Sequence, residues 1–321
     1  MLAYHRLIPV IISLCIISCG KPSPQLSVSS SPIDSNPAPS SITYIPVVRD
    51  SAAFRIPVGR NIIVKKYFAF IDSVVAVANR QINGYQINEH ILVHANAWII
   101  DTLASFDYYQ MINRDSFVYD QSQLIILKSH DTLSIPDSAW AANIQHRLSQ
   151  TRIDVNIPQF TLWIYRNNKI WRTCKVRVGR NARQFLKLAG REMDLRTPIG
   201  NGEIVRIARE PYYVNPRTGK KYKGTTRDDG RFTLMPIIPW LEPSIGGIRY
   251  GSMIHPTTNP ETLGKAYSNG CVGTTESDAW YIYYNAPVGT MITFRYDLTT
   301  TNEQGDTIQL NDIYGLSKKR P

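Results

Sequence analysis

Cysteine is scarce in this chain of 321 residues, which holds only Cys15, Cys19, Cys174 and Cys271. No group of cysteine, histidine and aspartate residues has the spacing of metal ligands. The sequence therefore predicts no metal site, and we expect no cofactor.

Long apolar runs are also lacking. The N-terminal run from Leu7 to Ile17 has eleven residues, too few for a helix to span a bilayer core of about 30 Å. It follows His5 and Arg6 and precedes a cysteine, which is the layout of an export signal.

The residues Ile16-Ile17-Ser18-Cys19 resemble the lipobox of bacterial lipoproteins. The resemblance implies that residues 1–18 are cleaved as a signal peptide and that Cys19 is lipidated, so the chain has a membrane partner through its anchor. Gly20, in place of an aspartate, implies the outer membrane of a two-membraned bacterium. A plain secretory signal or an uncleaved anchor is the alternative.

Acidic residues are outnumbered: 25 Asp and Glu stand against 36 Lys and Arg, for a net charge of +11. This excess favours acidic partners such as nucleic acid, anionic lipid or an anionic wall polymer. Because no motif of basic and aromatic residues accompanies the charge, and because the N-terminus indicates export, we expect no nucleic-acid partner.

Composition divides the chain further. Residues 19–41 are rich in Ser and Pro and predict a flexible tether. Residues 42–150 predict a smaller α+β domain of unknown role, residues 151–297 a mostly β domain, either a sandwich or an open barrel, and residues 298–321 a polar tail. Periodicity predicts helices at 62–80, 89–104 and 276–284, and strands at 117–119, 124–127, 154–158, 160–165, 170–178, 202–208, 231–237 and 291–296.

Two cysteines remain after processing. Cys174 alternates with Val176 and Val178 on one face of a predicted strand, which indicates core packing. Cys271 follows Gly270 in a loop, as a reactive thiol requires. A disulfide between the two cysteines is the competing interpretation.

His255 precedes Cys271 by 16 positions, and the intervening segment is rich in turn-forming residues. An imidazole and oriented backbone N–H groups can promote loss of the thiol proton. The pattern therefore predicts Cys271 as a nucleophile with His255 as its base, whereas a packed cysteine and an ordinary histidine are the structural alternative.

Five segments, in this order, resemble the YkuD type of L,D-transpeptidase catalytic domain: Leu162 to Tyr165, Val176 to Gly179, Arg196 to Gly200, Met253 to His255 and Ser268 to Val272. The resemblance implies a β-rich fold with one helix after the catalytic cysteine. It also implies peptidoglycan stem peptides as the substrate, a thioester at Cys271, His255 as general base, and an oxyanion hole and substrate contacts at Ser268, Asn269, Gly270 and Pro256.

Two positions depart from the family pattern: Asn269 stands where a histidine is usual, and Gly273 where an arginine is usual. Backbone donors survive both changes, but an arginine that could hold a substrate carboxylate is missing. Arg249, Lys265 and Arg295 are candidates to replace it. At Pro256, the backbone carbonyl remains available to orient the imidazole.

The sequence thus predicts an exported, lipid-anchored L,D-transpeptidase on the periplasmic face, acting as a monomer on stem peptides. An L,D-carboxypeptidase or endopeptidase with the same nucleophile is the enzymatic alternative. A wall-binding lipoprotein without catalysis is the other alternative.

Overall fold

The computed structural model describes residues 51–302 and 304–317. The predicted signal peptide, the lipidation site Cys19 and the tether 19–41 lie outside the described residues. Within the described ranges, every helix is too short or too polar to cross a bilayer.

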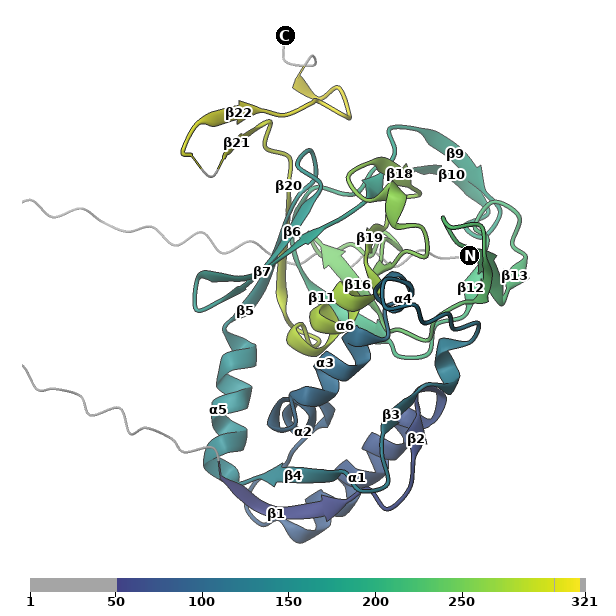
Figure 1. The fold of residues 1–321 in the computed structure, drawn as a ribbon. Coiled ribbons are helices and arrows are strands. Elements are labelled where there is room, and N and C mark those ends of the chain that lie inside the picture. The colour runs from purple at the N-terminus through teal and green to yellow at the C-terminus, as the bar shows by residue number, and fades with distance from the viewer. Residues whose placement is uncertain (1–50, 303, 318–321) are drawn as a thin grey trace, which may run out of the picture. The chain divides into compact units, whose positions relative to one another are not determined.

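An eight-stranded sheet forms the centre of the C-terminal half (Figure 1). Two neighbouring pairs, β19 with β17 and β20 with β5, run parallel, and the others run antiparallel. The strand order is β19 (Val272–Thr274), β17 (Ile254–Pro256), β16 (Trp240–Ile245), β11 (Gly200–Ala208), β20 (Met291–Arg295), β5 (Thr151–Asn156), β6 (Thr161–Arg166) and β7 (Lys169–Lys175). The predicted mostly β fold is confirmed.

Short two-stranded elements extend from this sheet. They are β8 (Val178–Gly179) with β18 (Ala266–Ser268), β9 (Arg183–Leu186) with β10 (Arg191–Asp194), β12 (Tyr213–Val214) with β13 (Lys221–Tyr222), β14 (Gly224–Thr226) with β15 (Phe232–Leu234), and β21 (Thr299–Thr301) with β22 (Thr307–Gln309). The 3₁₀ turn η3 (Pro260–Thr262) lies between β17 and β18.

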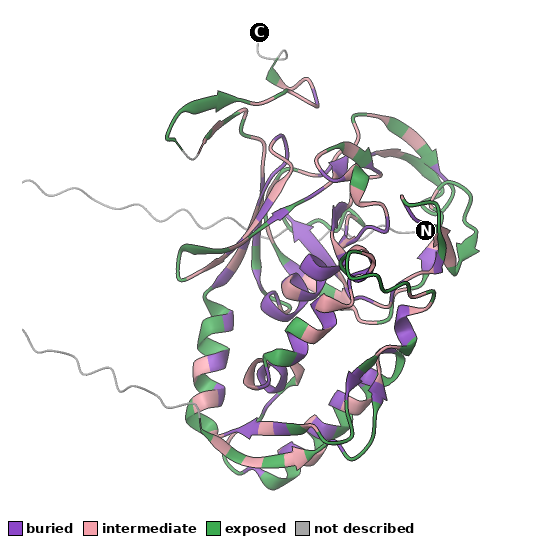
Figure 2. Cartoon of the chain, viewed as in Figure 1, coloured by how far each residue is buried: buried purple, intermediate pink, exposed green. Residues whose placement is uncertain are grey.

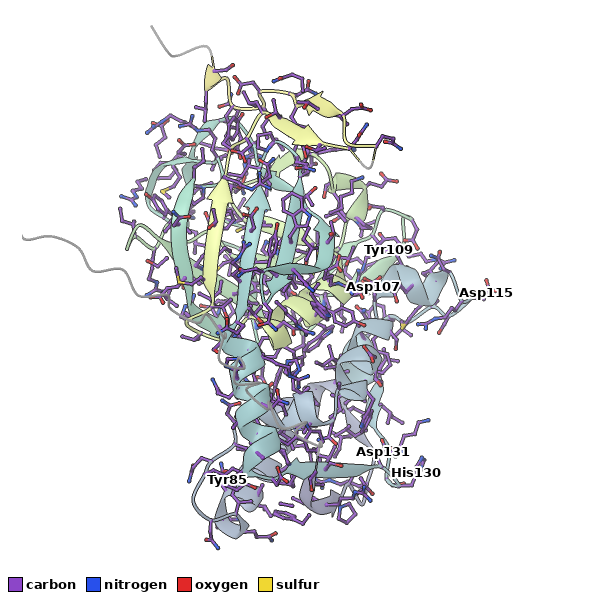
Figure 3. The ribbon with its side chains drawn as sticks, turned by 90° about the vertical axis from the view of Figure 1, so that its left-hand side faces the viewer. Tyr85, Asp107, Tyr109, Asp115, His130 and Asp131 are labelled. Carbon is purple, nitrogen blue, oxygen red and sulfur yellow. The ribbon has the colours of Figure 1, made fainter. Side chains whose placement is uncertain are left out.

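The N-terminal described part is mainly helical. It contains β1 (Ala52–Pro57) paired with β4 (Thr132–Pro136), β2 (Ile62–Ile63) paired with β3 (Ile125–Leu127), the 3₁₀ turns η1 (Val64–Lys66) and η2 (Gln121–Gln123), and the helices α1 (Tyr67–Gln81), α2 (Glu89–Ala95), α3 (Trp98–Ser105), α4 (Tyr108–Ile112) and α5 (Ser138–Ser149). Helix α5 leads directly into β5. Asp107 and Tyr109 lie next to the sheet, whereas Tyr85, His130 and Asp131 lie farther from it (Figure 3).

Three sequence predictions for this part differ from the structure, one of them only in where its helix begins. The predicted helix 62–80 begins only at Tyr67, after β2 and η1. The predicted helix 89–104 is broken at Asn96, whose side chain bonds to Leu92 O and to the backbone of Ser134. Residues 117–119 form no strand, because Phe117 and Tyr119 lie about half exposed without a partner strand.

Helix α6 (Glu276–Asn285) directly follows β19 and was predicted at 276–284. Thr275 caps it, since its hydroxyl accepts the Asp278 N–H at 3.0 Å. Helices α2 and α3 pack against α6, which also contacts β16 and β17. The buried hydrophobic core is continuous from α1 through α6 to β20, with purple, buried segments on both sides of α6 (Figure 2).

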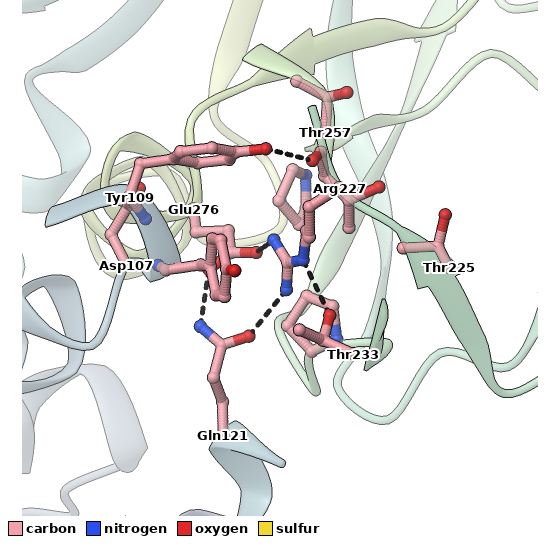
Figure 4. A network of polar contacts seen from close by, with 12 residues as sticks. Asp107, Tyr109, Gln121, Thr225, Arg227, Thr233, Thr257 and Glu276 are labelled. Atoms are coloured by element: carbon pink, nitrogen blue, oxygen red, sulfur yellow. Dashed lines mark hydrogen bonds and ion pairs between the residues drawn. The ribbon is translucent and has the colours of Figure 1, made fainter. Parts of the chain in front are cut away.

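A buried polar network joins the N-terminus of α6 to the helical part (Figure 4). Glu276 Oε2 accepts from Tyr108 N at 3.0 Å and from Gln121 Nε2 at 2.6 Å. Asp107 Oδ2 accepts the Ser277 N–H at 2.9 Å. The helical part thereby fixes the start of the helix that follows Cys271 and β19.

Candidate active site

Cys271 lies immediately before β19, at the end of a tight turn. Gly270 has φ +106°, which side chains other than glycine rarely allow. Cys271 is half-buried, and its Sγ accepts the Met253 N–H at 3.4 Å. Burial raises the pKa of the thiol, while the Met253 N–H and the Arg177 guanidinium act in the opposite direction. The resting residue is therefore a thiol that needs a base.

His255 lies on β17, the parallel neighbour of β19. In the register, Ile254 pairs with Val272 and His255 with Gly273. Alternate residues of a strand share a face, so His255 and Cys271 lie on the same side of adjacent strands. Both side chains line one cavity.

The His255 ring is held by two contacts. Its Nδ1 lies 2.8 Å from Pro256 O, and because a carbonyl only accepts, Nδ1 carries the proton and Nε2 is left as the acceptor. Trp240 stacks on the ring with centroids 4.7 Å apart. Burial, aided by the Arg177 charge, lowers the pKa of His255 to about 4. At neutral pH the imidazole is an uncharged base.

Ser268 holds the turn before the cysteine. Its Oγ donates to Cys271 O at 2.6 Å and accepts the Gly270 N–H at 3.2 Å. Within the described residues, no acceptor lies at hydrogen-bond distance from the N–H groups of Asn269 and Cys271. These two N–H groups are the ones that remain available to a reacting carbonyl oxygen.

Arg177, which sequence reasoning did not select, supplies the guanidinium of this site. It lies between β7 and β8, and its backbone exchanges two hydrogen bonds with Gly273, of 2.9 and 3.0 Å. A Cβ on residue 273 would lie 2.5 Å from Arg177 Nε. The side chain of Arg177 therefore occupies the space above Gly273.

The three replacement candidates from the sequence were wrong. Arg249 forms a two-pronged ion pair with Glu242, and Arg295 pairs with Asp154 and Asp297. Lys265 is exposed. None of the three lines the cavity. Strand alternation shows that Arg177 faces away from Cys174 and Val176, but only the fold brings it to β19.

The cavity has a volume of about 780 Å³. Leu186, Leu188 and Met193 of the β9–β10 hairpin form one side, and Val214 and Tyr222 of the β12–β13 hairpin form another. A single hydrogen bond, from Leu188 N to Pro216 O at 3.1 Å, joins the two hairpins. This volume and apolar lining suit a ligand of several residues.

Residues 150–294 match the family described as the L,D-transpeptidase catalytic domain, YkuD. This part of the chain is a YkuD domain. No curated protein matches the sequence.

Several solved structures match part of the chain at low sequence identity. An L,D-transpeptidase from Mycobacterium smegmatis is 15% identical, with a TM-score of 0.32, over 46% of this chain and 58% of that chain. L,D-transpeptidase 3 from Mycobacterium tuberculosis, in complex with a faropenem-derived adduct, is 14% identical, with a TM-score of 0.31, over 46% and 60%. The L,D-transpeptidase of Xylanimonas cellulosilytica is 12% identical, with a TM-score of 0.33, over 62% and 91%. The chain thus spans about three fifths of the length of the first two.

The C-terminal segment beyond the YkuD domain contributes to the same cavity. Tyr314 and Leu316 line it. The Tyr314 hydroxyl donates to Gly179 O at 2.7 Å and accepts the Thr197 N–H at 3.0 Å. Thr197 in turn donates to Gly270 O at 3.1 Å. The segment predicted as a polar tail is therefore linked to the turn before Cys271.

The other cysteine has a different environment. Cys174 is 1% exposed, and both cysteines are free thiols. Val176 and Val178 are buried beside it. The predicted core role of Cys174 is confirmed, and the alternative of a disulfide with Cys271 is wrong.

Proposed function

We propose that this protein is a cysteine-dependent L,D-transpeptidase that acts on peptidoglycan stem peptides and so cross-links or remodels the cell wall. The observation that carries the proposal is the position of Cys271 and His255 on adjacent parallel strands, lining one cavity of a YkuD domain. The neutral imidazole, with its Nε2 unprotonated, is suited to accept a proton from the thiol.

In the first half-reaction, Cys271 Sγ attacks the carbonyl of the L-centre residue while His255 Nε2 takes the thiol proton. The oxyanion that forms accepts hydrogen bonds from the N–H groups of Cys271 and Asn269. Collapse breaks the bond to the terminal D-alanine, whose nitrogen receives the proton from His255. The acyl group is left on Cys271 as a thioester.

In the second half-reaction, an amine of another stem peptide attacks the thioester and His255 accepts its proton. The carbon–sulfur bond breaks, and the sulfur takes the proton back from His255. If water replaces the amine, the same steps make the protein an L,D-carboxypeptidase. If the first half-reaction also expels the amine of a cross-linked peptide in place of D-alanine, the protein is an endopeptidase.

Muropeptide mass spectrometry tests the acceptor. We expect the purified protein to convert a stem tetrapeptide into cross-linked dimers and free D-alanine. Shortened monomers without dimers would instead show that water is the acceptor. An unchanged substrate would favour the alternative of a wall-binding lipoprotein without catalysis.

A carbapenem tests the nucleophile. We expect the intact protein to gain the mass of one drug molecule, and we expect Cys271→Ala to gain none. Cys174→Ala is the matched control, because it removes the buried thiol and leaves the cavity unchanged. An adduct that persists in Cys271→Ala would refute the assignment.

We also propose that the protein is exported and anchored by a lipid on Cys19 to the periplasmic face of the outer membrane. The lipobox-like residues before Cys19 support this proposal. Palmitate labelling in cells tests it, since Cys19→Ala should lose the label and accumulate with residues 1–18 attached. Labelling that survives the substitution would contradict the anchor.

A further inference from the structure

Polar atoms without a partner gather at the cavity. Four buried side-chain nitrogen or oxygen atoms make no hydrogen bond within the described residues, and three of them belong to cavity-lining residues: Arg177 Nε, Trp240 Nε1 and Asn269 Oδ1. The fourth, Arg209 Nε, has Glu89 at 3.4 Å. Buried polar groups in folded proteins are usually paired, so the polar groups around this cavity are the least satisfied by the described part of the chain.

The charge of the cavity wall is also uncompensated. Three arginines line it, Arg177, Arg180 and Arg196, but Asp194 is the single carboxylate and it pairs with Arg196 at 2.5 Å. Arg180 donates to the neutral Gln184 side chain. The guanidinium groups of Arg177 and Arg180 therefore lie in the cavity wall without a carboxylate partner among the described residues.

Arg177 is the less solvated and the better placed of the two. Its one side-chain hydrogen bond runs from Nη1 to Thr262 Oγ1 at 3.2 Å. The charge of Arg177 interacts with Cys271, Tyr222, Tyr267, His255 and, as a carboxylate beyond ion-pair distance, Asp228. Asp228 is already used, since it accepts from Asn259 Nδ2 and Glu261 N.

The backbone fixes this guanidinium beside the nucleophile. Arg177 and Gly273 are paired by two backbone hydrogen bonds, and Gly273 lies two residues after Cys271 on the same face of β19. The missing Cβ of Gly273 leaves the space that the Arg177 side chain fills. A planar guanidinium held in this way can receive a carboxylate with two parallel hydrogen bonds.

We propose that Arg177 binds a free carboxylate of the stem peptide next to the scissile carbonyl, so that the enzyme selects acidic stem peptides over amidated ones. This proposal rests on the proposed function and specifies its substrate. The carboxylate is either that of the diamino acid side chain or that of the terminal D-alanine, and the experiment separates the two.

The test compares three synthetic tetrapeptides: the free acid, the form with a carboxamide on the diamino acid side chain, and the form with a C-terminal carboxamide. Single-turnover acylation of Cys271 is followed by intact mass for the full-length protein. One of the two amidations should slow acylation of the wild type by roughly 10- to 100-fold, as expected when a charge-assisted hydrogen bond is lost. The amidation that does so identifies the carboxylate.

Arg177→Gln should slow acylation by the free-acid peptide by a similar factor and remove the preference for the free acid over the amidated form. Arg177→Lys should retain part of the preference, because it keeps the charge and loses the planar fork. Arg249→Gln is the matched control, since it removes one positive charge outside the cavity and should keep the full preference. If Arg177→Gln does not fold, the acylation rates of the wild type and of Arg177→Lys with the three peptides still test the proposal.

Arg177 could instead act only by stabilising the thiolate, and alkylation by neutral iodoacetamide distinguishes this role. In that case Arg177→Gln slows alkylation and slows all three peptides equally, which overturns the proposal. Equal acylation of all three peptides by the wild type also overturns it, while the proposed function stands. No acyl-enzyme from any peptide overturns the proposed function and this inference with it.

Discussion

Two arginines of the described residues, the buried Arg227 and the half-buried Arg177, differ in their partners. The side chain of Arg227 is 0% exposed, and each of its three nitrogens has an acceptor: Glu276 at 2.5 Å, Gln121 at 3.0 Å and Thr233 at 2.7 Å (Figure 4). Its guanidinium also lies 4.3 Å from the centre of the Tyr108 ring. Arg177 has a single hydroxyl partner and an orphan Nε.

The number of hydrogen-bond acceptors around each guanidinium distinguishes an arginine that stabilises the fold from one that can bind a ligand. Each nitrogen of Arg227 has an acceptor, and two of the acceptors, on Gln121 and Glu276, are distant in sequence, so these bonds hold the helical part to the start of α6. Arg177 is unsaturated and lines a cavity, so its remaining bonding capacity is directed to a ligand. The two residues differ in exposure, since Arg227 is buried and Arg177 is half-buried, and they differ more in the number of acceptors that they have.

The paired arginine should give the largest effect. Arg227→Ala leaves the Glu276 carboxylate buried without its counter-charge, and we expect the free energy of unfolding to fall by about 3 to 5 kcal/mol. Chemical denaturation measures this change. Arg183→Ala is the control, because both side chains of its ion pair with Glu192 are exposed and such a pair contributes about 0 to 1 kcal/mol. If the two substitutions cost the same, Arg227 has no special structural role.

Crowding the unpaired arginine should give an intermediate effect. Gly273→Ala places a Cβ 2.5 Å from Arg177 Nε and 2.7 Å from its Cγ. We expect a loss of about 1 to 3 kcal/mol in unfolding free energy, typical of overpacking. The double variant Gly273→Ala with Arg177→Ala should recover most of it. A double variant as unstable as Gly273→Ala would show that the clash lies elsewhere.

Removing the unpaired arginine should change stability little. Arg177→Met loses one hydrogen bond to Thr262 and relieves a poorly compensated charge, so we expect a change of less than about 1 kcal/mol in either direction. Thermal unfolding beside Arg227→Ala measures the contrast. A loss as large as that of Arg227→Ala would place Arg177 among the structural residues.

The smallest expected effect is a shift of the pH profile. The pKa of His255 is about 4, so acylation by a carbapenem should rise as pH increases through that value and the imidazole becomes neutral. The Arg177 charge lowers the pKa of His255 and that of Cys271. In Arg177→Met the pKa of His255 and the pKa of Cys271 should therefore both rise, and the pH profile of acylation should move to higher pH. A profile that stays in place would mean that the charge acts on neither group.

Local sequence signals were sufficient to predict α6 and to place Cys271 after a glycine turn. The glycine-cysteine turn and the Thr275 cap are encoded by neighbouring residues, and strand alternation identified Cys174 as a core residue. The domain boundaries, like the roles of the site residues, stay predictions. Arg177 could not be selected from sequence, because a strand pattern shows which face a residue takes and not which distant strand lies over it.

Strand β16 is a second element that local sequence patterns could not predict. Pro243 and the polar residues Glu242 and Ser244 are typical of a loop, yet all three are buried in the sheet. Glu242 is tolerated there because Arg206 and Arg249 both bind its carboxylate. Tertiary ion pairs of this kind have no local signature, and so the strand that carries Trp240 to the imidazole was not predicted.

Tyr314 lies outside the residues that match the family, yet it contributes to the cavity. The family match ends at residue 294, but the hydroxyl that joins Gly179 to Thr197 comes from residue 314. A fragment cut at the family boundary would expose a carbonyl and an N–H beneath the cysteine turn and would leave one side of the cavity open. The part of the chain that builds the cavity is therefore longer than the part that matches the family.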